Sequence, residues 1–145
     1  MTRRPTGVSN VRKVSMEWTG RGMEFAGCGV DPPSPSMVMD GAGEAGPSPM
    51  QALLLAAAGC SGSDVVHIMG KMRITLQRLT IDVQGVRRVE HPRRYVSMLM
   101  VFTMRGEGLT QEQAERAVDL SVTKYCSVIQ TLAPDVKLTH EVVLA

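Results

Sequence analysis

Residues 52–67 carry the sequence ALLLAAAGCSGSDVVH, and this stretch decides how the rest of the chain must be arranged. As a helix it is apolar on all sides from Ala52 to Ala58, and a helix of that kind is buried on every side. Gly59 to Ser63 keep the middle of the helix narrow, although each glycine costs about 1 kcal/mol of helix propensity. Close approach by another element would offset that cost. We therefore expect a buried central helix with a neighbour packed tightly against its middle.

Capping signals set the limits of this helix. Ser48 and Gln51 stand three residues apart, as in a capping box, and Pro49 suits the first helical position, where its missing N–H costs nothing. From there the helix is predicted to run to about Arg73, which makes it roughly 35 Å long at 1.5 Å per residue.

The segments on either side of the central helix indicate the fold class. A second helix is predicted to begin at Thr110, where Gln113 again completes a capping box, and to continue until Pro134 ends it. Alternation of apolar and other residues with a period of two predicts strands over residues 11–18, 22–29, 36–39, 79–84, 96–104 and 136–144. Because strands pair with strands before helices intervene, an α+β fold is expected.

The central helix also bears on the oligomeric state. A helix that is apolar all round needs cover on both sides, and a sheet built from 145 residues covers only one. A second subunit can supply the other side, so we expect an obligate, interleaved homodimer. The alternative is a monomer whose sheet wraps fully round the helix.

Length and composition exclude several classes of protein. The 145 residues fit one domain, 1–145. A net charge of +2 and an aromatic content of 3% argue against a nucleic-acid partner. No apolar run approaches the roughly 20 residues that span a bilayer, and residues 1–10 lack the apolar stretch of a signal peptide, so a cytoplasmic protein without a membrane partner is expected. The histidines at 67, 91 and 140 have no metal-ligand spacing, so neither a metal nor a cofactor is predicted.

Two of the three cysteines lie in segments that invite a chemical interpretation. Cys60 stands mid-helix in AAGCSGSDVVH, and Cys126 stands in TKYCSVI on the inner part of the second helix. The plain alternative is packing, since a free cysteine is commonly buried as a small hydrophobe. Cys28, in the strand GMEFAGCGV, is interpreted as packing or as an incidental surface thiol.

These segments resemble the OsmC/Ohr family, the osmotically inducible and organic hydroperoxide resistance proteins. The resemblance extends over nearly the whole chain and rests on four stretches: GPSPM at 46–50, LLLAAAGCSGSDVV at 53–66, EHPR at 90–93 and AVDLSVTKYCSVIQTL at 117–132. A helix with AAGCS together with a second helix with KYCSV points to the OsmC-like branch. The resemblance implies antiparallel sheets packed around two central helices in an interleaved homodimer.

The resemblance also implies an activity, that of a two-cysteine thiol peroxidase for organic hydroperoxides, with hydrogen peroxide left open as a second substrate. Cys60 would attack the hydroperoxide and become a sulfenic acid, and Cys126 would resolve it as a disulfide. A dithiol, in the Ohr branch a lipoylated protein, would then reduce both cysteines. The two Cα atoms must lie within about 7 Å for this, although 66 residues separate them in the chain.

The sequence departs from the family at the groups that hold and activate the thiolate. Family peroxidases carry a Glu shortly before the first cysteine and an Arg from the N-terminal strands. Met50 and Gln51 stand where the acid would fall, and neither is acidic. Arg21, in the turn TGRG, is the candidate cation, with a solvated turn residue as the equal alternative.

Two further ionisable residues follow Cys60 on the same helical face. Asp64, four residues on, would place a negative charge beside a thiolate if it is ionised. His67, seven residues on, could offset that charge when protonated, although a core or interface histidine is the more ordinary interpretation.

The family's missing acid keeps two functions open. The first is the peroxidase, with an apolar pocket at the dimer interface whose expected wall residues are Met50, Gln51, Leu53, Leu54 and Tyr125. The second is a non-catalytic protein of the same fold that binds a small lipophilic molecule or senses oxidation.

Overall fold

The computed structural model describes residues 10–145. The N-terminal residues used above to exclude a signal peptide lie outside this range, Asn10 excepted. The chain divides into two compact units, one ending at Ala52 and one spanning Leu53–Ala145, and each is described by itself. The expectation of a single domain over 1–145 stays a prediction.

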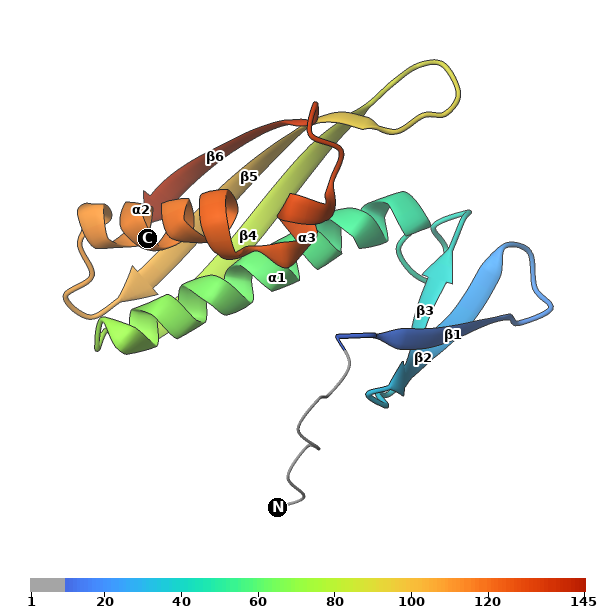
Figure 1. Ribbon diagram of the computed structural model, residues 1–145, viewed down its shortest axis with the longest axis horizontal. Helices are drawn as coiled ribbons and strands as arrows, with labels where there is room; N and C mark the ends of the chain where they lie inside the picture. The colour runs from blue at the N-terminus through green and yellow to red at the C-terminus, as the bar shows by residue number, and fades with distance from the viewer. Residues whose placement is uncertain (1–9) are drawn as a thin grey trace. The chain divides into compact units, whose positions relative to one another are not determined.

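The first unit is a three-stranded antiparallel sheet, in the order β1-β2-β3 (Figure 1). Its strands are β1 (Lys13–Trp18), β2 (Glu24–Asp31) and β3 (Met37–Asp40), so all three predicted N-terminal strands are present, including the short third one. Backbone N–H groups of Ala45 and Ala42 donate to the buried Asp40 carboxylate at 3.0 and 2.8 Å and hold its pKa below the ordinary value. These bonds shape the loop that leads into the first helix.

Helix α1 (Pro49–Lys71) begins as the capping signals predict and ends two residues before Arg73. The backbone N–H of Ser48 donates to Gln51 Oε1 at 3.0 Å, and the N–H of Gln51 donates to Ser48 Oγ at 3.2 Å. This is the reciprocal bonding of a capping box.

With 23 residues, α1 is long and apolar enough to cross a membrane by length and composition alone, so the expectation that no segment reaches that size is wrong. The central helix of a soluble core passes the same test. Ala57, Val65 and Met69 of α1 are buried in the core of the second unit.

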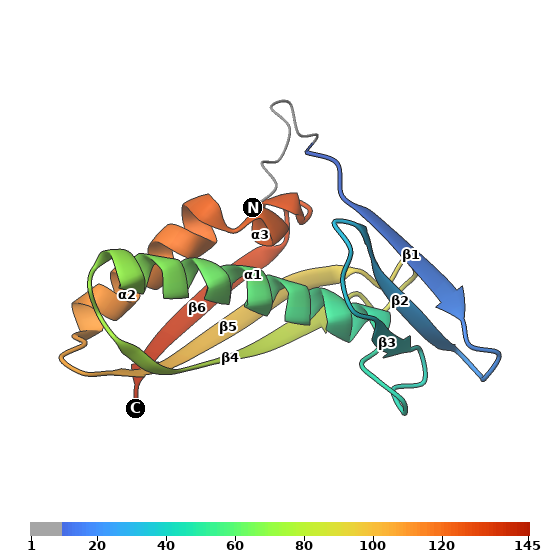
Figure 2. The ribbon, with the colours of Figure 1, turned by 90° about the horizontal axis from the view of Figure 1, so that it is seen from below.

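The second unit places helices on one face of a three-stranded sheet, in the order β4-β5-β6 (Figures 1 and 2). The elements are β4 (Leu76–Arg87), β5 (Tyr95–Gly106), α2 (Gln111–Leu120) and β6 (Lys137–Leu144). The core lies between the sheet and the helices, and the central strand β5 supplies four fully buried side chains to it: Met98, Met100, Phe102 and Met104.

One strand direction differs from the expected antiparallel sheets. β4 and β5 are antiparallel, but β6 runs parallel to β5, with Met100 paired to His140. The segment between β5 and β6 contains α2, and a helical crossover returns the chain to the end of the sheet from which β5 started. The last strand therefore runs in the same direction as β5, and this sheet is mixed.

The sequence predicted one continuous second helix, but the structure shows an interrupted one. α2 begins at the predicted Thr110 cap, with its Gln113 capping box, and is followed by a π-helical turn, η1 (Ser121–Tyr125), and a short helix, α3 (Ser127–Thr131). Between them Cys126 is extended, with φ −69° and ψ 105°. A π turn inserts one residue into a helix, so apolar residues on both sides of the break still face the core.

Residues 52–58 are not buried on every side within the single chain, and the cover expected from a second subunit stays a prediction. Ala57 is fully buried, whereas the side chains of Leu53 and Leu55 are 37% and 57% exposed. The β4–β6 sheet lies on one side of α1 (Figure 2), and these two leucines stay partly exposed.

A close contact at Gly62 confirms the expected neighbour and provides a test. A Cβ atom at Gly62 would stand 2.9 Å from Ile81 Cδ1 on β4, whereas one at Gly59 would meet nothing within 4 Å. We expect Gly59→Ala to raise the free energy of unfolding by about 0.5–1 kcal/mol through helix propensity. Gly62→Ala should give no gain, because the same propensity is offset by overpacking.

The control removes the contacting atom itself. In an Ile81→Val background, which lacks Cδ1, Gly62→Ala should become stabilising, with a coupling of about 0.5 kcal/mol or more. Urea denaturation at one fixed protein concentration measures all four proteins. Equal effects of Gly62→Ala in both backgrounds would show that the helix and β4 do not meet at this contact.

Candidate functional site

The two cysteines singled out in the sequence meet in the second unit. Cys60 lies half-buried in the middle of α1, and Cys126 is fully buried at the break between η1 and α3. Both are free thiols, and their side chains are within hydrogen-bonding contact. The fold thus brings together two sulfur atoms that lie 66 residues apart in the chain.

A buried serine fixes the backbone on both sides of this contact. The hydroxyl of Ser121 donates to Asp64 Oδ2 at 2.9 Å, with the carbonyl oxygen of Ser61 as a second acceptor at 3.2 Å. The carbonyl oxygen of Ser121 accepts the N–H of Cys126 at 2.8 Å, the bond that closes the π turn. α1 and the segment carrying Cys126 are therefore joined within one turn of both cysteines.

The acid–base state of Cys126 follows from its surroundings. Burial raises the pKa of Cys126 from 9.0 to about 11, and the hydrogen bond with Cys60 adds to the rise, while the backbone N–H of Ile129 opposes it. Cys126 is therefore a neutral thiol near pH 7. It must release a proton when it attacks another sulfur atom.

Asp64 has a different environment from the one expected. Its carboxylate accepts a hydrogen bond from the Ser121 hydroxyl, and this bond connects Asp64 to the π turn. Asp64 therefore links two structural elements, as well as standing one helical turn after Cys60. The sequence pattern did not predict a role for Ser121, although this polar residue stands three residues after Val118, among the apolar residues that lead to Cys126. A polar residue at that position was the available signal.

Arg21, the predicted cation, has a carboxylate partner inside the first unit. Its guanidinium donates to Glu24 Oε2 at 2.7 Å, and its side chain is 79% exposed. The hydroxyl of Thr19 also donates to that carboxylate at 2.6 Å. The two hydrogen bonds lower the pKa of Glu24, and the bond from Thr19 contributes more than the bond from Arg21. The role of Arg21 at the thiolate stays a prediction.

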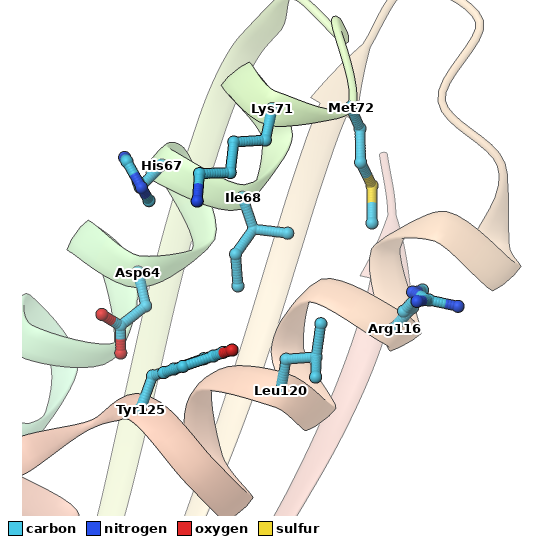
Figure 3. Close-up of a pocket in the computed structure, with 8 residues that line it drawn as sticks. All are labelled: Asp64, His67, Ile68, Lys71, Met72, Arg116, Leu120 and Tyr125. Carbon is cyan, nitrogen blue, oxygen red and sulfur yellow. The ribbon is translucent and has the colours of Figure 1, made fainter.

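The five residues expected to line one pocket do not share the cavity that contains Tyr125. Tyr125 is half-exposed and borders a cavity of about 470 Å³ between the C-terminal half of α1 and the α2–η1 segment (Figure 3). None of the other four lines that cavity. Gln51 is used in the helix cap, and Leu54 lies over Gly85 of β4.

The remaining candidates have ordinary surroundings. His67 is exposed and borders the same cavity as Tyr125, so within this chain it is not a core histidine. Cys28 is half-buried on β2, opposite Ser15 of β1. Among residues 10–145, no group of three or more His, Cys, Asp or Glu side chains is placed to hold a metal ion.

The fold and the paired thiols define a class of small α+β protein, and comparison with known proteins gives its family. The model of the OsmC-like protein family matches residues 41–141, so the chain belongs to that family and the resemblance noted in the sequence is confirmed. Protein YhfA of Escherichia coli strain K12 is 42% identical over 112 residues, which cover 75% of this chain and 84% of YhfA.

Solved structures show the same fold at low sequence identity. An OsmC-like protein from Mycoplasma pneumoniae superposes with a TM-score of 0.80 at 14% identity, covering 94% of this chain and 98% of its own. The organic hydroperoxide resistance protein OsmC of Legionella pneumophila, also described as a predicted redox protein, gives a TM-score of 0.63 at 16% identity, covering 92% and 96%. Both likenesses concern the fold.

The raised pKa of Cys126 gives a testable expectation. In a Cys28→Ser/Cys60→Ser protein, Cys126 is the remaining thiol. Its pKa should fall below the value of about 11, because Cys60 no longer contributes, and should stay above 9.0, because burial remains. Thiolate absorbance in the ultraviolet, followed from pH 7 upward in the folded protein, measures this. A midpoint below pH 9 would contradict the buried position of Cys126.

Proposed function

We propose that this protein is a cysteine-dependent thiol peroxidase that reduces organic hydroperoxides. The observation that carries the proposal is the contact between Cys60 and Cys126, one half-buried and one fully buried, across two helical segments. A disulfide needs Cα atoms within about 7 Å, and two thiols in hydrogen-bonding contact meet the need for proximity without a large backbone movement. Hydrogen peroxide is proposed only as a secondary substrate.

The proposed chemistry uses three sulfur steps. The Cys60 thiolate attacks the terminal oxygen of the hydroperoxide, the O–O bond breaks, and the departing alkoxide takes a proton to become an alcohol. The Cys126 sulfur then attacks the Cys60 sulfenic acid, its own proton leaves with the hydroxyl as water, and a disulfide forms. A dithiol reductant, proposed to be lipoyl-like and cytoplasmic, restores both thiols by exchange and becomes a disulfide itself.

Family membership supports this proposal, as does the fold shared with the hydroperoxide resistance protein of Legionella pneumophila. The absence of an acidic residue at Met50 and Gln51 predicts slow turnover, because the family uses that acid to hold a cation over the thiolate. The same absence favours the second candidate, a redox-sensing or lipophile-binding protein in which the cysteines oxidise without sustained turnover.

Three cysteine variants separate these alternatives. Cys60→Ser should abolish consumption of cumene hydroperoxide in the presence of dihydrolipoamide, because the attacking sulfur is gone. Cys126→Ser should leave a sulfenic acid on Cys60, detected by dimedone adduct formation and intact mass. Cys28→Ser is the matched control and should retain the full rate. Full multi-turnover activity in Cys60→Ser would contradict the peroxidase assignment. A wild-type protein whose cysteines are oxidised once by hydroperoxide, without repeated cycles, would favour the redox-sensing alternative.

We further propose that the protein is an obligate homodimer in which a second copy covers the exposed face of α1. In support, Leu55 and Val66 are 57% and 55% exposed on that helix, and Leu53 is 37% exposed. Leu55 and Val66 lie eleven residues apart on one side of the helix. Exposed aliphatic side chains on a core helix are typical of a surface that another chain covers.

A pair of charge substitutions tests the dimer. Wild-type protein should sediment as a dimer at low micromolar concentration in analytical ultracentrifugation. Leu55→Glu should shift it to monomer or prevent folding, because a carboxylate would be buried unpaired. Val89→Glu is the control, since Val89 is 91% exposed in the β4–β5 turn and should leave the dimer intact. A stable, folded wild-type monomer at that concentration would refute the proposal.

A further inference from the structure

The cavity beside Tyr125 has the make-up of a ligand site that is separate from the cysteine pair. Its volume, about 470 Å³, lies in the range of sites for small molecules. Ile68 and Met72 of α1 and Leu120 of α2 form its apolar part, and Figure 3 shows their side chains directed toward one another across it. Neither Cys60 nor Cys126 lines it.

The polar groups at its rim are mainly donors and cations. Lys71 extends its amino group along the cavity, and the Tyr125 hydroxyl points inward from the opposite side (Figure 3). His67 and Arg116 also border it. Within residues 10–145, the side chains of Lys71, His67 and Arg116 form no hydrogen bond or ion pair. Asp64, the one carboxylate at the rim, is already bonded to the Ser121 hydroxyl.

The position of Tyr125 is supported from outside the cavity. The Nζ atom of Lys124 stands 5.2 Å from the centroid of the Tyr125 ring, a cation–π contact that favours this orientation of the ring. The phenol hydroxyl is therefore available as a donor to a ligand in the cavity.

A neighbouring groove restricts where an anion can lie. Arg116 also borders a second cavity on the other side of α2, where the acidic residues Glu112, Glu115, Asp119 and Glu141 gather. That groove repels an anionic head group. Within the cavity beside Tyr125, the favourable place for negative charge is consequently near the Lys71 amino group, with the apolar part extending along Ile68, Met72 and Leu120.

We propose that this cavity binds an aliphatic monocarboxylate of medium chain length. The single negative charge of a carboxylate matches the ammonium group of Lys71, and its oxygen atoms accept charge-assisted hydrogen bonds from such a donor. The alkyl chain gains by leaving water for the apolar part. This binding requires neither peroxide nor oxidation of the cysteines, so it stands or falls separately from the peroxidase.

Octanoate titrated into the full-length, reduced protein is the direct test. The methyl resonances of Met72 and Ile68 should shift and saturate, and affinity should rise about threefold to fourfold for each CH₂ from hexanoate to octanoate. Octyltrimethylammonium, with the same tail and the opposite charge, should bind at least tenfold more weakly than octanoate.

Matched variants locate the head group. Lys71→Gln should weaken octanoate binding at least fivefold while leaving the weak binding of octanol unchanged. Lys137→Gln removes an exposed lysine from β6 and should change neither. Met72→Gln should weaken octanoate and octanol alike.

Three results would overturn the proposal. They are equal binding of octanoate and octyltrimethylammonium, unchanged octanoate affinity in Lys71→Gln, and methyl shifts at residues outside the cavity. Met72 and Ile68 signals that respond to dilution of the protein and not to octanoate would also overturn it, because a second copy of the chain would then fill the space.

Discussion

The contact of α1 with the π turn before Cys126 depends on one hydrogen-bonded serine. Ser121 is fully buried, and its hydroxyl has Asp64 and the Ser61 carbonyl of α1 as acceptors. A hydroxyl buried at a helix crossing without a partner would be strongly unfavourable, so this pairing specifies one register of the two segments. The same register brings Cys126 to Cys60. The hydrogen bonds of the Ser121 hydroxyl, about one turn away from the cysteines, thus determine where the two sulfur atoms lie.

Local signals in the sequence predicted local structure well. Both capping boxes, at Ser48 and Thr110, are formed, because each depends on side chains three residues apart. The narrow middle of α1 at Gly62 meets Ile81 as its small residues suggested. The meeting of Cys60 with Cys126 was expected from the family resemblance, and nothing in the spacing of the residues alone required it.

Features that depend on the path of the chain could not be predicted from such local patterns. Period-two alternation marks β6 as a strand but carries no information on its direction, which the crossover through α2 decides. The π turn inserts one residue without changing which side of the segment is apolar, so the pattern from Ala114 to Ile129 continues across the break. Arg21 shows a third limit, since its salt bridge to Glu24 needs the actual geometry of the turn.

The methionines of β5 have a consequence for how such a protein ages. The side chains of Met98, Met100 and Met104 are at most 1% exposed and form much of the core. A thioether converted to a sulfoxide becomes polar and no longer fits an apolar interior. While the second unit stays closed, oxidants cannot reach these sulfurs, but a transient opening would expose several at once. Damage to this interior would therefore accumulate at a pace set by how often the fold opens, with repair depending on enzymes that reduce methionine sulfoxide.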